Sequence, residues 1–196
     1  MLFLIDKSPA DVERKNESSL VGGQLLTPLT NYRNWGGKYA IDNGAFSTFH
    51  ADAFVRQLAR NEASRADCFF VTVPDIVGSA QRTIELWRYR RRWVGEEWPL
   101  AFVAQDGQEM LPIPWNEMAA VFIGGGDPWK DSKAAQDIVK TATRLGIHVH
   151  VGRVNTPKRY DLFADLGADT CDGSGVARYD HMLENIEVRK SAPTLF

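Results

Sequence analysis

Cysteine is scarce in this sequence, and long apolar runs are absent. Only Cys68 and Cys171 occur among 196 residues, so the sequence cannot supply a cysteine cluster for structural zinc. Both lie in apolar runs, which predicts buried free thiols in a reducing cytoplasm. The apolar run at residues 1–5 stops at Asp6, which predicts a first strand and not a signal peptide. No run approaches the about 18 apolar residues of a membrane span, so we expect a cytoplasmic protein without a membrane partner.

An excess of either charge is also missing. The chain has 23 Lys and Arg against 25 Asp and Glu, a formal net charge of −2. Nucleic acid is therefore not attracted globally, and a polyanionic partner would need a local basic patch. With 44% hydrophobic residues, the chain can bury a core. Its length predicts a single domain at 1–190 and a C-terminal tail at 191–196.

Strand and helix signals alternate along the chain. Apolar runs predict strands at 2–5, 23–28, 38–42, 68–73, 100–104, 120–123, 147–151 and 169–171. Helical periodicity and capping residues predict helices that follow Ser8, at 50–65, at 79–93, at 132–145, after Thr156 and at 177–188. This alternation predicts a parallel α/β fold. The number of units favours a closed (β/α)8 barrel of the TIM type, and the alternative is an open doubly wound parallel sheet.

Polar residues and glycines gather where the predicted strands end. They are Asp42, Asn43, Asp75, Gln105, Asp106, the glycines at 124–126, Gly152, Arg153 and Asp172. In both candidate folds the site lies at the carboxyl ends of the strands, so we expect these groups around one mouth. Carboxylates can accept hydrogen bonds from the N1–H and amino group of a guanine edge, and a glutamine amide can donate to O6. The set suits a purine-like ligand.

The ordered motifs resemble the tRNA-guanine transglycosylase superfamily over residues 38–175. The family's general-base segment, Asp-Ser-Gly-Gly-Phe-Gln, is similar to Asp-Asn-Gly-Ala-Phe at 42–46, and a later strand is followed by Pro-Asp at 74–75. Its Val-Gln-Gly-Gly segment is similar to 103–107, aligned on the glutamine, and its glycine-rich strand end to Ile-Gly-Gly-Gly at 123–126. Its Met-Gly-Val-Gly segment is similar to 151–154, and its nucleophile segment, Gly-Ile-Asp-X-Phe-Asp, to Gly-Ala-Asp-Thr-Cys-Asp at 167–172.

This resemblance implies a double displacement in which Asp172 is the nucleophile and Asp42 the general base. It also implies a substrate-binding set of Asn43, Gly44, Phe46, Asp75, Gln105, Gly124, Gly125, Gly152 and Arg153. The family's zinc subdomain is missing, so the chain looks most like the zinc-free branch that inserts 7-deazaguanine derivatives into DNA. The implied partners are DNA, with tRNA less favoured, and a free 7-deazaguanine-type base, without a cofactor or a metal. For contacts to the nucleic acid we predict Arg153, Lys158, Arg159 and Arg178.

Other interpretations stay open from the residues alone. Water could accept the sugar, which would make the chain a nucleosidase or an N-glycosylase, or the barrel could be an inactive subunit that binds a base or nucleic acid. Asp169 is predicted to be structural. His148 and His150 share one strand face, and we expect buried or hydrogen-bonded structural histidines because no further metal ligand stands out. The basic aromatic stretch at 87–93 is more typical of a solvated helix face than of a phosphate-binding site.

Overall fold

The computed structural model describes residues 1–191 of the chain. The predicted tail at 191–196 lies outside the described residues except for Ser191, which ends the last helix. Within the described part, no helix is long and apolar enough to cross a membrane. The two cysteines have free thiols; Cys171 is buried as predicted, whereas Cys68 is only half-buried.

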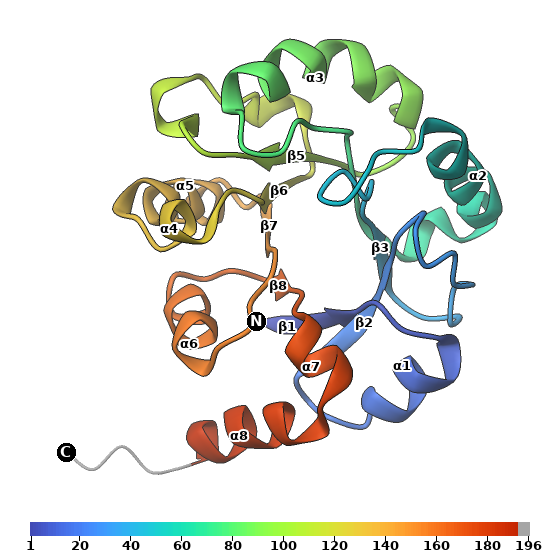
Figure 1. Cartoon of the computed structure of the whole chain (residues 1–196), viewed down its shortest axis with the longest axis vertical. Coiled ribbons are helices and arrows are strands. Elements are labelled where there is room, and N and C mark those ends of the chain that lie inside the picture. The colour runs from blue at the N-terminus through green and yellow to red at the C-terminus, as the bar shows by residue number, and fades with distance from the viewer. Residues whose placement is uncertain (192–196) are drawn as a thin grey trace.

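Eight parallel strands close into a barrel in chain order (Figure 1). The strands are β1 Leu2–Ile5, β2 Val21–Leu26, β3 Tyr39–Ile41, β4 Cys68–Thr72, β5 Leu100–Ala104, β6 Ala120–Ile123, β7 His148–Val151 and β8 Thr170–Cys171. The barrel closes because β1 pairs with β8, with Phe3 opposite Cys171. The predicted TIM-like barrel is confirmed, and the alternative of an open doubly wound sheet is wrong.

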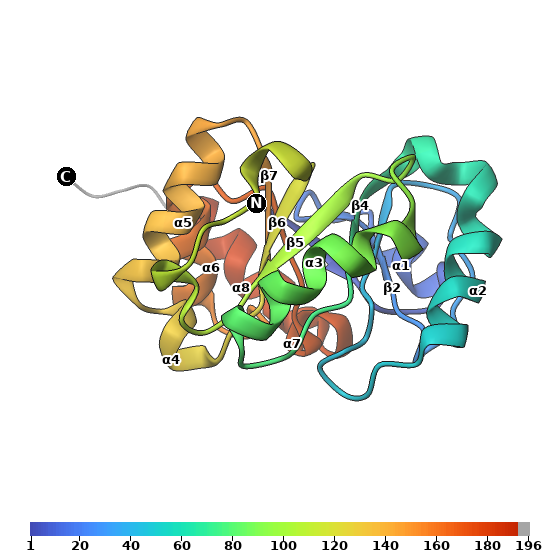
Figure 2. The ribbon, with the colours of Figure 1, turned by 90° about the horizontal axis from the view of Figure 1, so that it is seen from above.

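Helices surround the barrel on its outside (Figures 1 and 2). They are α1 Pro9–Lys15, α2 Ala51–Asn61, α3 Ala80–Val94, α4 Asp127–Lys130, α5 Lys133–Arg144, α6 Pro157–Asp165, α7 Ser174–Arg178 and α8 Asp180–Ser191. The connection from β2 to β3 contains no helix. The connection from β5 to β6 has only two 3-10 turns, η2 Gln108–Met110 and η3 Trp115–Glu117. These two short connections explain how 196 residues complete a barrel.

Most helix starts follow from the capping residues seen in the sequence. Ser8, Ser79 and Thr156 each accept a hydrogen bond from the backbone N–H three residues later, as an N-cap does. Three details differ from the expectation. The predicted helix at 50–65 continues beyond α2 as the 3-10 helix η1 Glu62–Asp67, the helix expected at 177–188 is two helices separated at Tyr179, and α4 was not predicted.

The core has two parts that lie on opposite sides of the barrel wall. The larger part packs the outer faces of the strands against the helices. The smaller part fills the barrel interior and contains Leu4, Leu25, Ala40, Phe70, Ala101, Val103, Ala120 and Phe122. Because side chains of a strand alternate between its two faces, strands β1 to β6 contribute to both parts. The filled interior leaves the carboxyl ends of the strands as the place for a site.

Candidate active site

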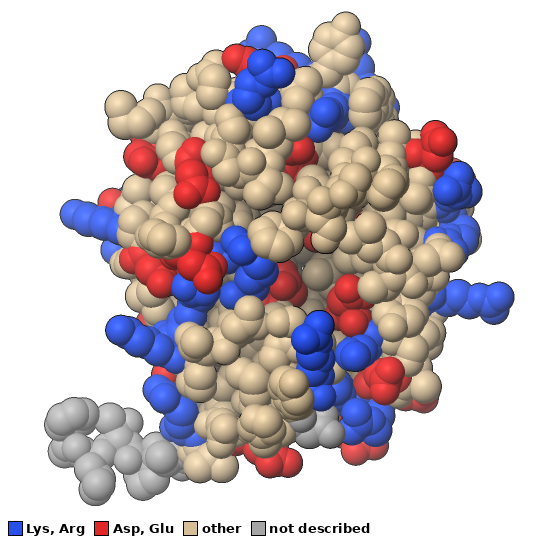
Figure 3. All heavy atoms as spheres, viewed as in Figure 1, with Lys and Arg blue, Asp and Glu red and all other residues tan. Residues whose placement is uncertain are grey.

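A cavity of about 440 Å³ opens at the carboxyl ends of the strands. Figure 3 shows acidic side chains in a hollow at the centre of one face. The predicted site residues that line the cavity are Asp42, Asn43, Gly44, Phe46, Asp75, Gln105, Gly124, Gly152, Arg153, Asp172 and Arg178. Gly125, Lys158 and Arg159 are not among its lining residues. The structure therefore brings together groups that lie up to 136 positions apart in the sequence (42 to 178).

Asp42 follows β3 and reaches the cavity as a half-buried carboxyl group. Its Oδ1 accepts a hydrogen bond from the Thr72 hydroxyl at 3.2 Å and one from the Gly44 N–H at 3.3 Å. Gly44 has a φ of 76°, a conformation that glycine adopts without strain. Burial raises the pKa of Asp42 to about 7, and the nearby charges of Asp172 and Asp75 add to this effect. Asp42 can therefore hold or release a proton near neutrality.

Asp172 follows β8 on the other side of the mouth, with 20% of its side chain exposed. Its Oδ1 accepts a hydrogen bond from the backbone N–H of Arg153 at 3.0 Å. Its Oδ2 lies 3.1 Å from Nε2 of His150, which comes from β7. Gly152 is needed beside this pair, because a Cβ there would lie 2.7 Å from the ring of Phe122. One group from β7 and one from the loop that follows it thus fix both oxygens of the carboxylate.

Asp75 forms a closed hydrogen-bonded group with Asn43 and Gln105. Its Oδ1 accepts from Nδ2 of Asn43 at 3.0 Å, and its Oδ2 accepts from Nε2 of Gln105 at 2.7 Å. Gln105 Oε1 in turn accepts the N–H of Gly78 at 3.0 Å. Burial raises the pKa of Asp75, although the two amide donors oppose this shift. These three members of the predicted substrate-binding set are therefore held by one another in a fixed arrangement.

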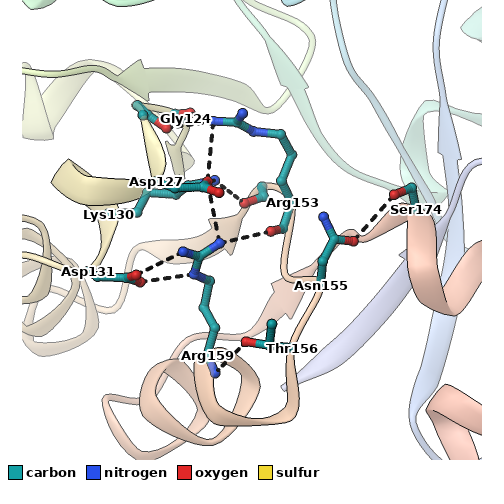
Figure 4. Close-up of polar contacts among 12 residues, drawn as sticks. Gly124, Asp127, Lys130, Asp131, Arg153, Asn155, Thr156, Arg159 and Ser174 are labelled. Atoms are coloured by element: carbon teal, nitrogen blue, oxygen red, sulfur yellow. Dashed lines mark hydrogen bonds and ion pairs between the residues drawn. The ribbon is translucent and has the colours of Figure 1, made fainter.

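Arg153 lies across the mouth between β6 and the loop after β3. Its guanidinium donates to the carbonyls of Gly124 at 3.2 Å and Gly125 at 2.7 Å, and it stacks 4.4 Å from the ring centroid of Phe46. Figure 4 shows the side chain reaching from its loop to Gly124. A Cβ on Gly125 would lie 2.4 Å from the ring of Trp129. The carbonyls of Gly124 and Gly125, two residues of the predicted substrate-binding set, thus accept hydrogen bonds from Arg153.

The predicted nucleic-acid contacts differ in their surroundings. Arg159 makes two hydrogen bonds to Asp131, at 2.9 and 2.8 Å, and an ion pair with Asp127 (Figure 4). Its charge is compensated within the protein. Lys158 is exposed on α6, and Arg178 is exposed at the edge of the cavity. Arg178 and Arg153 are thus the predicted cations that reach the mouth.

A buried lysine supports the loop that carries Arg153. Lys130 has no exposed side-chain surface and donates to the carbonyl of Gly152 at 2.7 Å. Burial lowers the pKa of Lys130 to about 8, and the charge of Arg153 contributes to this decrease. This lysine comes from α4, the short helix that sequence patterns did not reveal.

Two charged residues of the cavity, Asp6 and Lys7, follow β1 and were not predicted as site residues. Asp6 accepts a hydrogen bond from the Thr30 hydroxyl at 2.9 Å. Burial raises the pKa of Asp6, and the charge of Asp172 contributes. The signal was available, because Asp6 stands directly after a predicted strand, as Asp172 does.

The residues that were predicted to be structural lie away from the cavity or inside the barrel. Asp169, at the opposite end of β8, accepts the N–H of Val149 at 2.8 Å through its side chain. His148 and His150 both bond to the hydroxyl of Thr170, at 2.8 and 2.9 Å. The hydrogen bond from His150 to Asp172 was not foreseen. Among the described residues, no group of three or more His, Cys, Asp or Glu is arranged to hold a metal ion.

The fold and this cavity define the class of the protein as a TIM-like barrel with an acidic pocket at the carboxyl ends of its strands. Enzymes with this fold carry their active sites at that end. Beyond the fold class, no protein-family model matches the chain, and no curated protein matches it.

Proposed function

We propose that this barrel is a base-exchanging transglycosylase that replaces guanine in DNA with a 7-deazaguanine derivative. The observation that carries the proposal is the pair of carboxylates from β3 and β8, Asp42 and Asp172, which line one cavity in different environments. Burial raises the pKa of Asp42 to about 7, while Asp172 is held by two N–H groups. Titratable groups with contrasting environments divide the work of acid–base and nucleophilic catalysis between them.

In the first displacement, an oxygen of Asp172 attacks C1′ of the target nucleotide. The new C1′–O bond forms as the C1′–N9 bond to guanine breaks, and the bonding electron pair leaves with guanine. Asp42 in its protonated form donates the proton that the departing base requires. The product is an ester between the sugar and Asp172. Because Asp42 has a pKa of about 7, a substantial fraction carries this proton at neutral pH.

In the second displacement, the incoming 7-deazaguanine loses its proton to the Asp42 carboxylate. Its nitrogen attacks C1′, and the electron pair of the C1′–O bond returns to Asp172. Two inversions give net retention at C1′, the logic of a retaining glycosidase. One N-glycosidic bond replaces another, and each proton that Asp42 donates is regained. The exchange thus balances without an external oxidant, reductant or nucleotide cofactor.

The surroundings of the pair supply contacts for a purine and for phosphate. Asp75 and Gln105 line the cavity, and Phe46 presents an aromatic ring that is 61% exposed. Lys7, Arg153 and Arg178 line the same cavity and suit a polyanionic strand despite the net charge of −2. A target base in duplex DNA must leave the stack to reach Asp172, which costs a few kcal/mol.

The test is the exchange of labelled guanine into double-stranded DNA, with tRNA as a parallel substrate. Asp172→Asn removes the proposed nucleophile. Asp169→Asn is the matched control, because it changes a carboxyl group on the same strand that bonds Val149 and not the cavity. The proposal requires that label enters DNA, that Asp169→Asn retains exchange and that Asp172→Asn loses it.

Three other outcomes would point elsewhere. Label that enters tRNA and not DNA would reassign the substrate. Release of free base without incorporation of added base would indicate that water accepts the sugar, as in an N-glycosylase. Binding of base or DNA that is unchanged in Asp172→Asn, with no chemistry in either protein, would indicate an inactive binding subunit.

A further inference from the structure

A line of hydrogen bonds runs through the barrel interior and ends on Asp172. It connects His148 Nε2 to Thr170 Oγ1 at 2.8 Å, Thr170 Oγ1 to His150 Nδ1 at 2.9 Å, and His150 Nε2 to Asp172 Oδ2 at 3.1 Å. His148 and His150 come from β7, Thr170 comes from β8, and Asp172 directly follows β8; the two strands pair with His150 opposite Thr170. The line joins the interior of the barrel to the cavity.

The packing fixes the plane of the central imidazole. His150 has no exposed side-chain surface. Its ring packs against those of Phe70 and Phe122, with centroid distances of 4.9 and 4.6 Å. A 180° flip of the ring would place Cδ2 and Cε1 where Nδ1 and Nε2 now lie, and would break the bonds to Thr170 and Asp172. Both nitrogens are thus assigned to fixed partners.

Proton counting then gives the line a direction. The Thr170 hydroxyl has a single proton, so it can donate to only one of its two histidine neighbours and must accept from the other. If Thr170 donates to His150 Nδ1, the proton of a neutral His150 is on Nε2 and points at Asp172. His148 must then donate from its own Nε2. Every contact is satisfied with two neutral histidines.

The reverse order has a cost that the first lacks. If Thr170 donated to His148, then Nδ1 of His150 would carry a proton, and its contact to Asp172 would need a second ring proton or a proton on Asp172. The first option places a cation on a ring without exposed surface, where pairing with Asp172 must offset the cost of desolvation, and the second consumes the carboxylate. Burial also lowers the pKa of His148 to about 4, so this ring is neutral at neutral pH. The first order is therefore preferred.

We propose that His150 is a positioning residue for Asp172, and that Thr170 and His148 lock it in the neutral Nε2–H tautomer. The hydrogen bond to Oδ2 and the Arg153 N–H on Oδ1 together hold the carboxylate in one rotamer. In the exchange reaction Asp172 is first the nucleophile and then the leaving group, so a fixed N–H donor also stabilises the carboxylate as it departs. The role in the reaction rests on the proposed function, whereas the tautomer does not.

The test separates the tautomer from the chemistry. In the whole protein labelled with ¹⁵N on histidine, NMR at pH 7 should show protons on Nε2 of both His148 and His150 and none on Nδ1. Thr170→Val removes the hydroxyl while it keeps a similar shape. We expect the variant to populate the Nδ1–H tautomer of His150 as well. Thr83→Val is the control, because Thr83 is another buried threonine whose hydroxyl bonds Ile76 outside this line.

The kinetic part compares the same variants. Thr170→Val should lower kcat for guanine exchange by roughly 10- to 100-fold, with a smaller change in KM, as when the partner that orients a functional histidine is removed. His150→Gln should retain more activity than His150→Leu, because only the amide can donate to Asp172. Thr83→Val should leave kcat close to that of the wild type.

The outcomes distinguish the two proposals. A proton on His150 Nδ1 in the wild type, or a tautomer that Thr170→Val does not change, would overturn the locked line whether or not the protein is active. The expected tautomer together with full kcat in Thr170→Val and His150→Leu would overturn the positioning role. A wild type that exchanges no base in any substrate would refute the proposed function, and the NMR measurement would still decide the tautomer.

Discussion

The two sides of the barrel mouth hold their carboxylates by different means. On the β3–β5 side, the Thr72 hydroxyl and the Gly44 N–H bond Asp42, side-chain amides bond Asp75, and burial raises the pKa of both carboxyl groups. On the β7–β8 side, a buried imidazole and a backbone N–H bond Asp172. One fold thus offers a carboxyl group that exchanges protons near neutrality and another that is fixed by N–H donors. The contrast matches the division of roles between an acid–base group and a nucleophile.

The largest effect is expected when the carboxylate on the β8 side of the mouth is removed. Asp172→Asn should lower guanine exchange by about 10³-fold or more, because no covalent ester can form. Mass spectrometry of the protein trapped with DNA should lose the adduct. Asp169→Asn on the same strand should keep the adduct, and its loss in both variants would mean that the strand and not the nucleophile had been damaged.

The next largest effect is expected when the carboxyl group that follows β3 is removed. Asp42→Asn should lower exchange by roughly 10²- to 10⁴-fold, the range for a general acid–base group. DNA affinity should change far less, since the cations of the mouth remain. Exchange assays and DNA titrations on the same preparation would check this. A parallel loss of affinity and rate would assign Asp42 to binding.

The raised pKa of Asp42 also predicts a pH dependence. The exchange requires both protonation states, so the rate should be greatest near pH 7 and fall on either side. In folding, the native state holds the Asp42 proton more tightly than the unfolded chain does. This contribution to stability is present at acidic pH and is lost as the pH rises towards about 7.

Urea unfolding can measure this pH-dependent contribution of Asp42 to the free energy of unfolding, and it needs no activity assay. Between pH 5 and pH 8 the wild type should lose roughly 1–2 kcal/mol of stability relative to Asp42→Asn, after allowance for partial solvent screening. Asp169→Asn is the comparison for a carboxyl group outside the cavity. A difference between wild type and Asp42→Asn that does not vary with pH would contradict the raised pKa.

The smallest effect concerns the cations around the mouth. Arg178→Ala should weaken DNA binding by about 3- to 10-fold and reduce the salt dependence by about one charge, because Arg178 lines the cavity. Lys158→Ala changes an exposed cation outside the cavity lining and should have less effect. Equal losses in fluorescence-anisotropy titrations would mean that DNA covers α6 as well.

The fold could be predicted from the sequence because each strand run is apolar and ends in a polar or glycine residue. That local pattern identifies strands, and the count of eight then favours a barrel. Helix α4 was missed because it is a single turn at Asp127–Lys130, too short for a helical period. The break at Tyr179 was missed because no glycine or proline marks it; the residue has extended backbone angles between α7 and α8.

The residues that form the site were easier to predict from the sequence than the contacts among them. Strand-end acids are visible in the sequence, and the closed barrel brings them to one cavity. The pairing of His150 with Asp172 depends on the register of β7 against β8, which local patterns do not give. The hydrogen bonds of Arg159 to Asp131 were also not predictable, because Asp131 directly follows α4, a helix that local patterns do not reveal.

The side chain of Arg153 occupies part of the mouth, so a ligand must compete with it for the same contacts. A guanidinium is a planar group rich in N–H donors, and here it stacks on Phe46 and bonds the Gly125 carbonyl. A planar ligand that uses these two groups must exchange places with it. Its measured affinity would then equal the affinity for the open mouth multiplied by the fraction of molecules in which Arg153 has moved away. Ligand selectivity at this mouth would depend partly on which ligands bind Phe46 and the Gly125 carbonyl strongly enough to displace the Arg153 side chain.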